Sequence, residues 1–193
     1  MAQGFAEIEV KNRAELRRWL SRHHTQTESI WLISHKKSSP HYLPYDAIVE
    51  EALCFGWIDS QPRTLDEDRS MLRLSPRKAN SGWSQVNKAR IDKLIAAGLM
   101  TPAGLARIDE AKASGTWDLL NAAHSGEIPP DLAAAFKAYP HSADNFAAFP
   151  PSARKAILEW ISLAKRPETR AVRVGETARL AAINERANQW RKP

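Results

Sequence analysis

The chain of 193 residues has a single cysteine and no long apolar run. One cysteine, Cys54, excludes a disulfide or a thiolate metal cluster within one chain and is typical of a reducing compartment. No segment reaches the roughly 18 apolar residues that a membrane-spanning helix needs, and the N-terminus lacks the pattern of a secretory signal. We therefore expect a cytoplasmic protein without membrane insertion.

The common motifs of metalloproteins and hydrolases are missing as well. The six histidines show no HExxH or other metal-ligand spacing, and no serine lies in a GxSxG turn. The GxxxxGK[ST] spacing of a phosphate-binding loop is also absent. We predict no metal ion and no cofactor.

What the chain does contain is enough apolar material, 43% of its residues, to bury a core. In the first 75 residues, apolar runs predict strands over 5–10, 29–34, 57–64 and 70–75, with helices after the cap Asn12 and over 45–55. Helical patterns fill most of the second half, over 84–97, 102–114, 131–139, 143–148, 151–164 and 167–186. The prediction is an α+β fold, with a small, mainly antiparallel sheet and packed helices followed by a mostly helical C-terminal half.

We expect a division near the glycine- and proline-containing segment 122–130, which lacks periodicity and is a linker candidate. Residues 1–121 then form an α+β domain, and residues 122–193 form a helical region docked on it.

Positive charge is concentrated in residues 69–93, where seven Lys and Arg face one acidic residue. The whole chain carries a formal charge of +6, so the rest is close to neutral. A positive field of this kind attracts anions.

Within this segment, the loop 75–84 leads into a helix whose cap is Ser81 or Ser84. Free N–H groups at a helix N-terminus favour an anion, and Arg77 and Lys78 add positive charge. Arg73, on the preceding strand, is placed to complete a phosphate or carboxylate clamp. The alternative is a solvated basic loop with an ordinary helix cap.

A strand over 57–64 would put Trp57 and Asp59 on one face, and Arg63 on the same face as both. Asp59 is then either a carboxylate that orients an arginine or a ligand, or half of a structural ion pair. On the next helix, Trp83, Asn87 and Arg90 share one face. They form either the wall of a ligand pocket or a core tryptophan with a polar helix border.

Three stretches resemble a known bacterial family: ALCFGWIDSQ, then LSPRKANSGWSQVNKARIDKLIAAGLMTPAGL, and finally RKAILEWISLAKRPETRAVRVGETARL. They are similar to the YdeI/OmpD-associated (OmdA-like, bacteriocin-protection) family, over roughly residues 28–185. The resemblance implies a link to envelope stress or antimicrobial-peptide resistance and no established reaction.

Three functions remain open. The first is binding of a phosphate- or carboxylate-bearing small ligand through the ten residues named above, Trp57, Asp59, Arg63, Arg73, Arg77, Lys78, Ser81, Trp83, Asn87 and Arg90. The second is nucleic-acid binding by residues 69–93 and a C-terminal stripe of Arg166, Arg170 and Arg173. The third is an enzyme with Asp59 as acid or base. We favour the first, because Trp83 is the only aromatic residue in the basic segment and Asp59 has no catalytic partner in the sequence.

Overall fold

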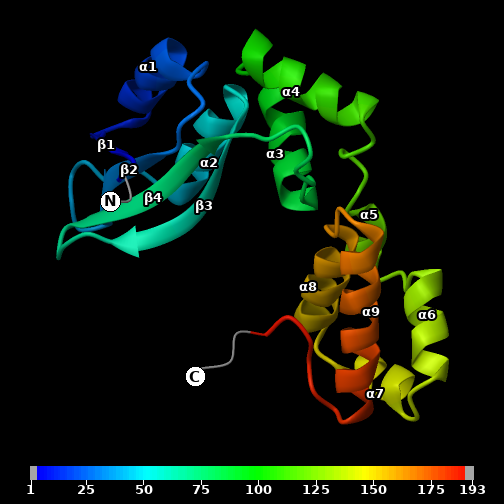
Figure 1. Cartoon of the computed structure of the whole chain (residues 1–193). Coiled ribbons are helices and arrows are strands. Elements are labelled where there is room, and N and C mark those ends of the chain that lie inside the picture. The colour runs from blue at the N-terminus through cyan, green and yellow to red at the C-terminus, as the bar shows by residue number, and fades with distance from the viewer. Residues whose placement is uncertain (1–3, 190–193) are drawn as a thin grey trace. The chain divides into compact units, whose positions relative to one another are not determined.

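A computed structural model describes residues 4–189 (Figure 1). They divide into two compact units, with the division between Thr116 and Trp117. We call them the N-terminal unit and the C-terminal unit and describe each by itself. Together they have the predicted α+β fold, with a mixed four-stranded sheet in the first unit and helices in both.

The elements of the N-terminal unit follow the predicted pattern closely. They are β1 (Ala6–Glu9), α1 (Arg13–His23), β2 (Ile30–His35), α2 (Tyr45–Cys54), β3 (Trp57–Thr64), β4 (Arg69–Pro76), α3 (Gln85–Ala96) and α4 (Pro102–Ala113). Side chains that can cap a helix fix three of the starts: Asn12, Ser84 and Thr101 each accept a backbone N–H of the first turn. After α2, Gly56 has φ 75°, a left-handed conformation that ends the helix where predicted.

The strand order is β1-β2-β4-β3, with β1 parallel to β2 and the other two pairs antiparallel. The sheet is therefore mainly antiparallel, as expected. Helices α1 and α2 lie on the face that carries Trp57, whose Nε1 donates to the His24 carbonyl at 3.1 Å and whose ring meets Trp19 edge-on. Trp31, Ile33 and Met71 form a buried cluster on the other face.

The C-terminal unit is helical, with α5 (Asn121–Ser125), α6 (Pro130–Lys137), α7 (Ser142–Ala148), α8 (Pro151–Ser162) and α9 (Pro167–Ala182). Prolines in the first turn start α6, α8 and α9. Helix α9 packs against α6, α7 and α8 (Figure 1). The core contains the fully buried side chains of Leu132, Phe146, Ile157 and Ile161.

Two expectations from the sequence, the linker candidate 122–130 and the lack of a membrane-spanning helix, can be compared with the structure. The segment 122–130 contains part of a short helix, α5, which its lack of periodicity concealed. Among the residues that the structure describes, no helix has both the length and the apolar character needed to cross a membrane.

Candidate functional site

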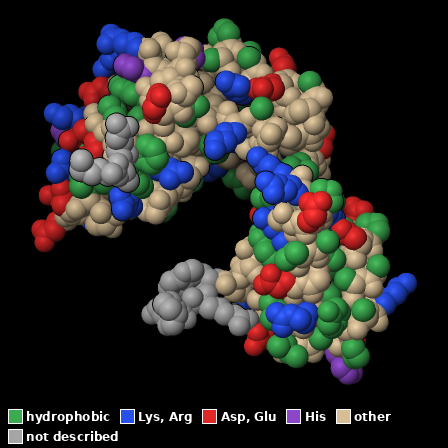
Figure 2. Space-filling model, in the orientation of Figure 1, with side chains coloured by type: hydrophobic (Ala, Val, Ile, Leu, Met, Phe, Trp, Pro, Cys, Tyr) green, Lys and Arg blue, Asp and Glu red, His purple; other side chains and the backbone are tan. Residues whose placement is uncertain are grey.

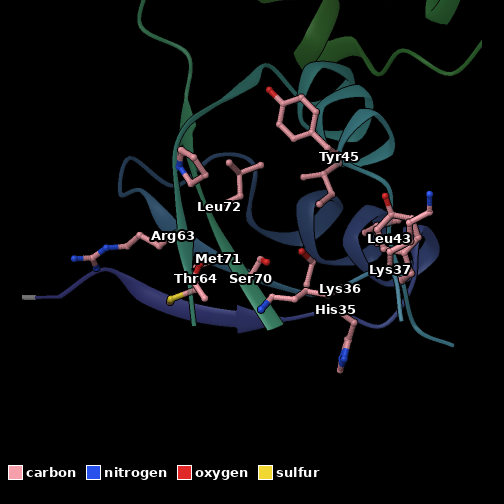
Figure 3. A pocket seen from close by; sticks show the side chains of 14 residues that line it. His35, Lys36, Lys37, Leu43, Tyr45, Arg63, Thr64, Ser70, Met71 and Leu72 are labelled. Atoms are coloured by element: carbon pink, nitrogen blue, oxygen red, sulfur yellow. The ribbon is translucent and has the colours of Figure 1, made fainter. Parts of the chain in front are cut away.

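A pocket of about 510 Å³ lies in the N-terminal unit between α2, the loop after β2, and strands β3 and β4. Ile48, Leu43 and Leu72 supply its apolar lining. Figure 3 shows Tyr45 at one end and Lys36 with Ser70 at the other, with Leu72 between them. We call it the α2 pocket. Its size falls within the range of about 300–1,000 Å³ that is usual for small-molecule sites.

The polar lining of the α2 pocket is basic. His35, Lys36, Lys37 and Arg63 line it, and no Asp or Glu is among the lining residues that the structure describes. Lys37 is exposed, whereas Nζ of Lys36 donates to the Asp66 carbonyl at 2.6 Å. The side chain of Arg63 points away from the pocket (Figure 3). The Lys36 ammonium has three N–H donors and retains two beside its bond to Asp66, so Lys36 and Lys37 are the cations that a ligand can use.

Tyr45 connects the α2 pocket to Asp59, a residue selected from the sequence. The Tyr45 hydroxyl donates to Oδ2 of Asp59 at 2.6 Å. Partial burial of the hydroxyl and this bond raise the pKa of Tyr45 from 10.0 to about 12, so the phenol holds its proton further into the alkaline range. The partner of Asp59 is thus a tyrosine at the pocket rim, whereas the sequence suggested an arginine.

A second polar link runs from α2 to α3. Arg90 donates to Oδ1 of Asp46 at 2.5 Å and to Oδ1 of Asn87 at 3.0 Å. Asn87 and Arg90 are neighbours, as the helical spacing predicted. Trp83 is only 2% exposed, which agrees with the alternative of a core tryptophan beside a polar helix border.

Arg77 is buried, with 5% of its surface exposed. Its guanidinium carbon lies 3.5 Å from the centroid of the Trp83 ring, and Nη2 donates to the Gly82 carbonyl at 2.6 Å. Nε and Nη1 are buried and have no hydrogen-bond partner among the described residues. Burial lowers the pKa of Arg77 to about 10, an effect that the charge of Asp59 partly offsets.

The other members of the expected anion clamp do not converge on Arg77. Lys78 is exposed, and the Ser81 hydroxyl donates to the Lys78 carbonyl at 2.8 Å instead of capping a helix. The cap of α3 is Ser84, which accepts the N–H of Asn87. Polar groups of the loop 75–84 therefore bond to one another, as Ser81 does to Lys78 and Arg77 to Gly82.

Arg73 and Arg63 lie on the opposite face of the sheet from Asp59. Arg73 pairs with Trp31 across β2 and β4 and lies over the Phe5 ring, at 5.3 Å from its centroid. Arg63 lies over Trp31 at 4.9 Å. The expected alignment of Arg63 with Asp59 was wrong, because a register shift between Asp59 and Pro62 inverts the faces of the residues that follow.

The basic segment 69–93 does not form a continuous charged surface. Arg69 pairs with Glu9 and Asp66, Arg90 pairs with Asp46, and Arg77 and Lys88 are buried. Opposite charges from other parts of the chain thus neutralise much of the excess that the local sequence shows.

Two of the three arginines of the predicted C-terminal stripe, Arg170 and Arg173, are engaged within their own unit, whereas Arg166 is exposed. Nε and Nη2 of Arg170 donate to the Asp131 carboxylate at 2.7 and 3.0 Å. Arg173 donates to the Trp160 carbonyl and lies over the Trp160 ring, at 4.9 Å from its centroid. Figure 2 shows acidic side chains among the basic ones on the visible face of this unit.

Cys54 is fully buried, and burial raises the pKa of its thiol. Its position is that of a core residue. Within residues 4–189, no group of three or more His, Cys, Asp and Glu side chains is arranged to hold a metal ion.

Sequence reasoning missed the lysines of the α2 pocket. Lys36 and Lys37 follow β2 directly, in the run His35-Lys-Lys-Ser-Ser-Pro-His-Tyr42. Basic residues at the end of a buried strand, followed by turn residues and a helix start, were a usable signal. The larger charge excess after residue 69 masked it.

Comparison with known proteins identifies two families along the chain. Residues 8–107 match the family described as "Domain of unknown function (DUF8412)". Residues 125–184 match OmdA, described as "Bacteriocin-protection, YdeI or OmpD-Associated", which confirms the predicted family over this part. The two earlier motifs, which we had attributed to the same family, fall within residues 8–107. No curated protein and no solved structure matches the chain. Because the first match covers more than half of the residues, the chain belongs to the DUF8412 family, and it carries an OmdA region in its C-terminal unit.

Proposed function

We propose that this protein binds a small anionic ligand, bearing a carboxylate or phosphate on an apolar body, in the α2 pocket. The observation that carries the proposal is the lining: apolar side chains from α2 and β4, with lysines and without a carboxylate. An apolar pocket with a few placed polar groups is the usual form of a small-molecule site.

The two ends of the pocket have different chemistry. Lys36 and Lys37 offer charge to the anionic group, and the apolar body lies against Ile48 and Leu72. At the other end, the Tyr45 ring supplies a flat surface whose orientation is held by its bond to Asp59. Lysine is a point charge without the planar fork of arginine, so the proposal includes both carboxylates and phosphates.

The OmdA match supports a link to bacteriocin protection. We propose that ligand binding is the molecular activity behind such a link. The pairing of Arg170 with Asp131 and of Arg90 with Asp46 gives no support to an extended nucleic-acid surface. Among the described residues the donor to Asp59 is Tyr45, and this pair alone gives no catalytic arrangement that we would propose.

A thermal-shift and calorimetric screen tests the proposal with inorganic phosphate, phenyl phosphate and benzoate, at two salt concentrations. A ligand that binds the folded state raises the melting temperature by mass action. We expect phenyl phosphate or benzoate to bind, and to bind more tightly than inorganic phosphate, because only they fill the apolar part of the pocket.

The deciding comparison is between two double variants that each remove two lysines. Lys36→Ala/Lys37→Ala is expected to abolish binding, whereas Lys78→Ala/Lys93→Ala, at exposed positions of the basic segment, is expected to retain it. The opposite result would move the site to the loop 75–84. A short oligonucleotide that binds only at low salt, with no response to the small anions, would instead favour nucleic acid.

A further inference from the structure

A second open groove, of about 530 Å³, lies within the C-terminal unit. Ala133 and Lys137 of α6 line it one helical turn apart, as do Ala143 and Ala147 of α7. Phe136 and Phe146 also line it, and their ring centroids are 5.3 Å apart. We call this the α6–α7 groove.

The alanines explain why the groove is open. Ala133, Ala143 and Ala147 are exposed, and their small side chains leave an open space beside Phe136 and Phe146, which are 9% and 1% exposed. A larger side chain at any of these positions would fill the space. The groove is therefore open because alanines occupy these exposed positions, where larger side chains would not disturb the core.

Two cations border this apolar surface. Arg154, in the first turn of α8, lines the groove, and its Nε is buried without a hydrogen-bond partner among the described residues. Lys137 is exposed at the groove. No Asp or Glu is among the lining residues that the structure describes. A buried N–H without a partner is costly, and a small shift of the Arg154 side chain toward an anion in the groove would supply that partner.

We propose that the α6–α7 groove binds a small amphipathic monocarboxylate, with the carboxylate on Arg154 and the apolar part on the exposed alanines and the edge of Phe136. The size of the groove separates a small molecule from a protein partner. Its volume is usual for a small ligand, whereas a stable protein interface needs about 20–30 residues on each side. A carboxylate is favoured over a phosphate because moving a single charge next to apolar groups costs less than moving a double charge.

This site is independent of the α2 pocket, since all of its residues belong to the C-terminal unit. Because most of its lining is apolar, the α6–α7 groove requires a ligand with an apolar chain as well as a negative charge. The proposal therefore stands or falls separately from the function proposed above.

Isothermal titration of the full chain with octanoate and with 1-octanol tests the site. We expect octanoate to bind and the alcohol of the same length to bind at least about tenfold more weakly, because it cannot form the charge-assisted bond to Arg154. Equal affinity for the two compounds, or no binding of octanoate, would overturn the proposal.

Variants locate the binding within the chain. Arg154→Gln is expected to weaken octanoate binding at least about tenfold. Arg179→Gln, which removes an exposed arginine outside the groove, should leave it unchanged. Ala147→Leu retains both cations and fills the groove at an exposed position, so it should abolish binding even if Arg154→Gln disturbs the fold. The Lys36→Ala/Lys37→Ala variant should bind octanoate like the natural chain, and loss of binding there would assign octanoate to the α2 pocket instead.

Discussion

The guanidinium carbon of Arg77 lies over Trp83, at 3.5 Å from the ring centroid, and both side chains are buried. Nη2 of Arg77 donates to the Gly82 carbonyl, while Nε and Nη1 have no hydrogen-bond partner among the described residues. The contact therefore combines a favourable cation–aromatic stack with two unpaired donors.

Because of this combination, we expect two substitutions of Arg77 to differ in their effect on the free energy of unfolding. Arg77→Lys should lower the free energy of unfolding by about 1–3 kcal/mol, since an ammonium group retains the buried charge and loses the planar stack. Arg77→Met should cost less, because it removes the charge and both unpaired donors and retains apolar volume. Urea denaturation measures both changes. Lys78→Met, at the exposed neighbour, is the control and should change stability by less than about 0.5 kcal/mol. A greater loss in Arg77→Met than in Arg77→Lys would mean that the charge of Arg77 has a partner, as an anion site would require.

The bond between Tyr45 and Asp59 has a pH signature. The pKa of Tyr45 is raised from 10.0 to about 12 in the folded chain, by burial first and by the bond to Asp59 second. Below pH 10 the phenol is protonated in both the folded and the unfolded chain, so its bond contributes fully to stability. Between pH 10 and about 12 the unfolded phenol ionises first, and this contribution is lost.

Titration of tyrosinate absorbance checks this prediction, because the chain has only three tyrosines. We expect one of them to ionise late. Tyr45→Phe should remove the late step, and Asp59→Asn should bring it to lower pH. Tyr42→Phe, at the other tyrosine of the α2 pocket, should leave it in place. A single transition near the ordinary pKa for all three tyrosines would contradict the bond.

Much of the fold was accessible from local signals. Caps such as Asn12, Ser84 and Thr101 are visible in the sequence, and each begins a helix where predicted. The short helix α5 was not visible, because five residues are too few to show a helical period and the neighbouring glycine and prolines indicate a loop.

The candidate site was less accessible, for two physical reasons. The register shift after Asp59 changes the face of Arg63, and strand alternation cannot reveal a shift within a stretch that is polar on both faces. Charge counted along the chain also ignores partners from distant segments, such as Glu9 for Arg69 and Asp46 for Arg90. The sequence-based prediction therefore overestimated the unpaired positive charge of residues 69–93 and missed Lys36 and Lys37 beside α2.

A buried carboxylate joins α2 to α1 and offers another test. Glu51 is 2% exposed and accepts from Nε of Arg13 at 2.6 Å and from Nη1 of Arg17 at 2.8 Å. We expect Glu51→Gln to lower the free energy of unfolding by about 2–3 kcal/mol, because two charge-assisted bonds weaken and the guanidinium groups lose their counter-charge. Glu50→Gln is a matched control. Glu50 is more exposed and pairs with one described residue, Arg13, so the loss of stability should be below about 1 kcal/mol in urea denaturation. Equal losses would show that burial of Glu51 adds nothing.

Two helical glycines should respond to the same substitution with opposite signs. A Cβ at Gly104 would collide with the backbone carbonyl of Cys54 and come within 2.8 Å of Met100 Cε, where α4 begins against the end of α2. The Thr101 hydroxyl donates to that same carbonyl at 2.6 Å, so the two helices cannot separate without losing this bond. Gly104→Ala should therefore destabilise the N-terminal unit by about 2–3 kcal/mol.

Gly175, in the interior of α9, has nothing within 4 Å of an added Cβ. Gly175→Ala should stabilise the C-terminal unit by about 0.5–1 kcal/mol, because alanine loses less backbone entropy in a helix. Thermal unfolding of both variants measures the two signs in one chain. If Gly104→Ala were tolerated like Gly175→Ala, then the close approach of α4 to Cys54 would not exist in solution, and the wall that α2 provides to the α2 pocket would be less rigid than the bond from Thr101 implies.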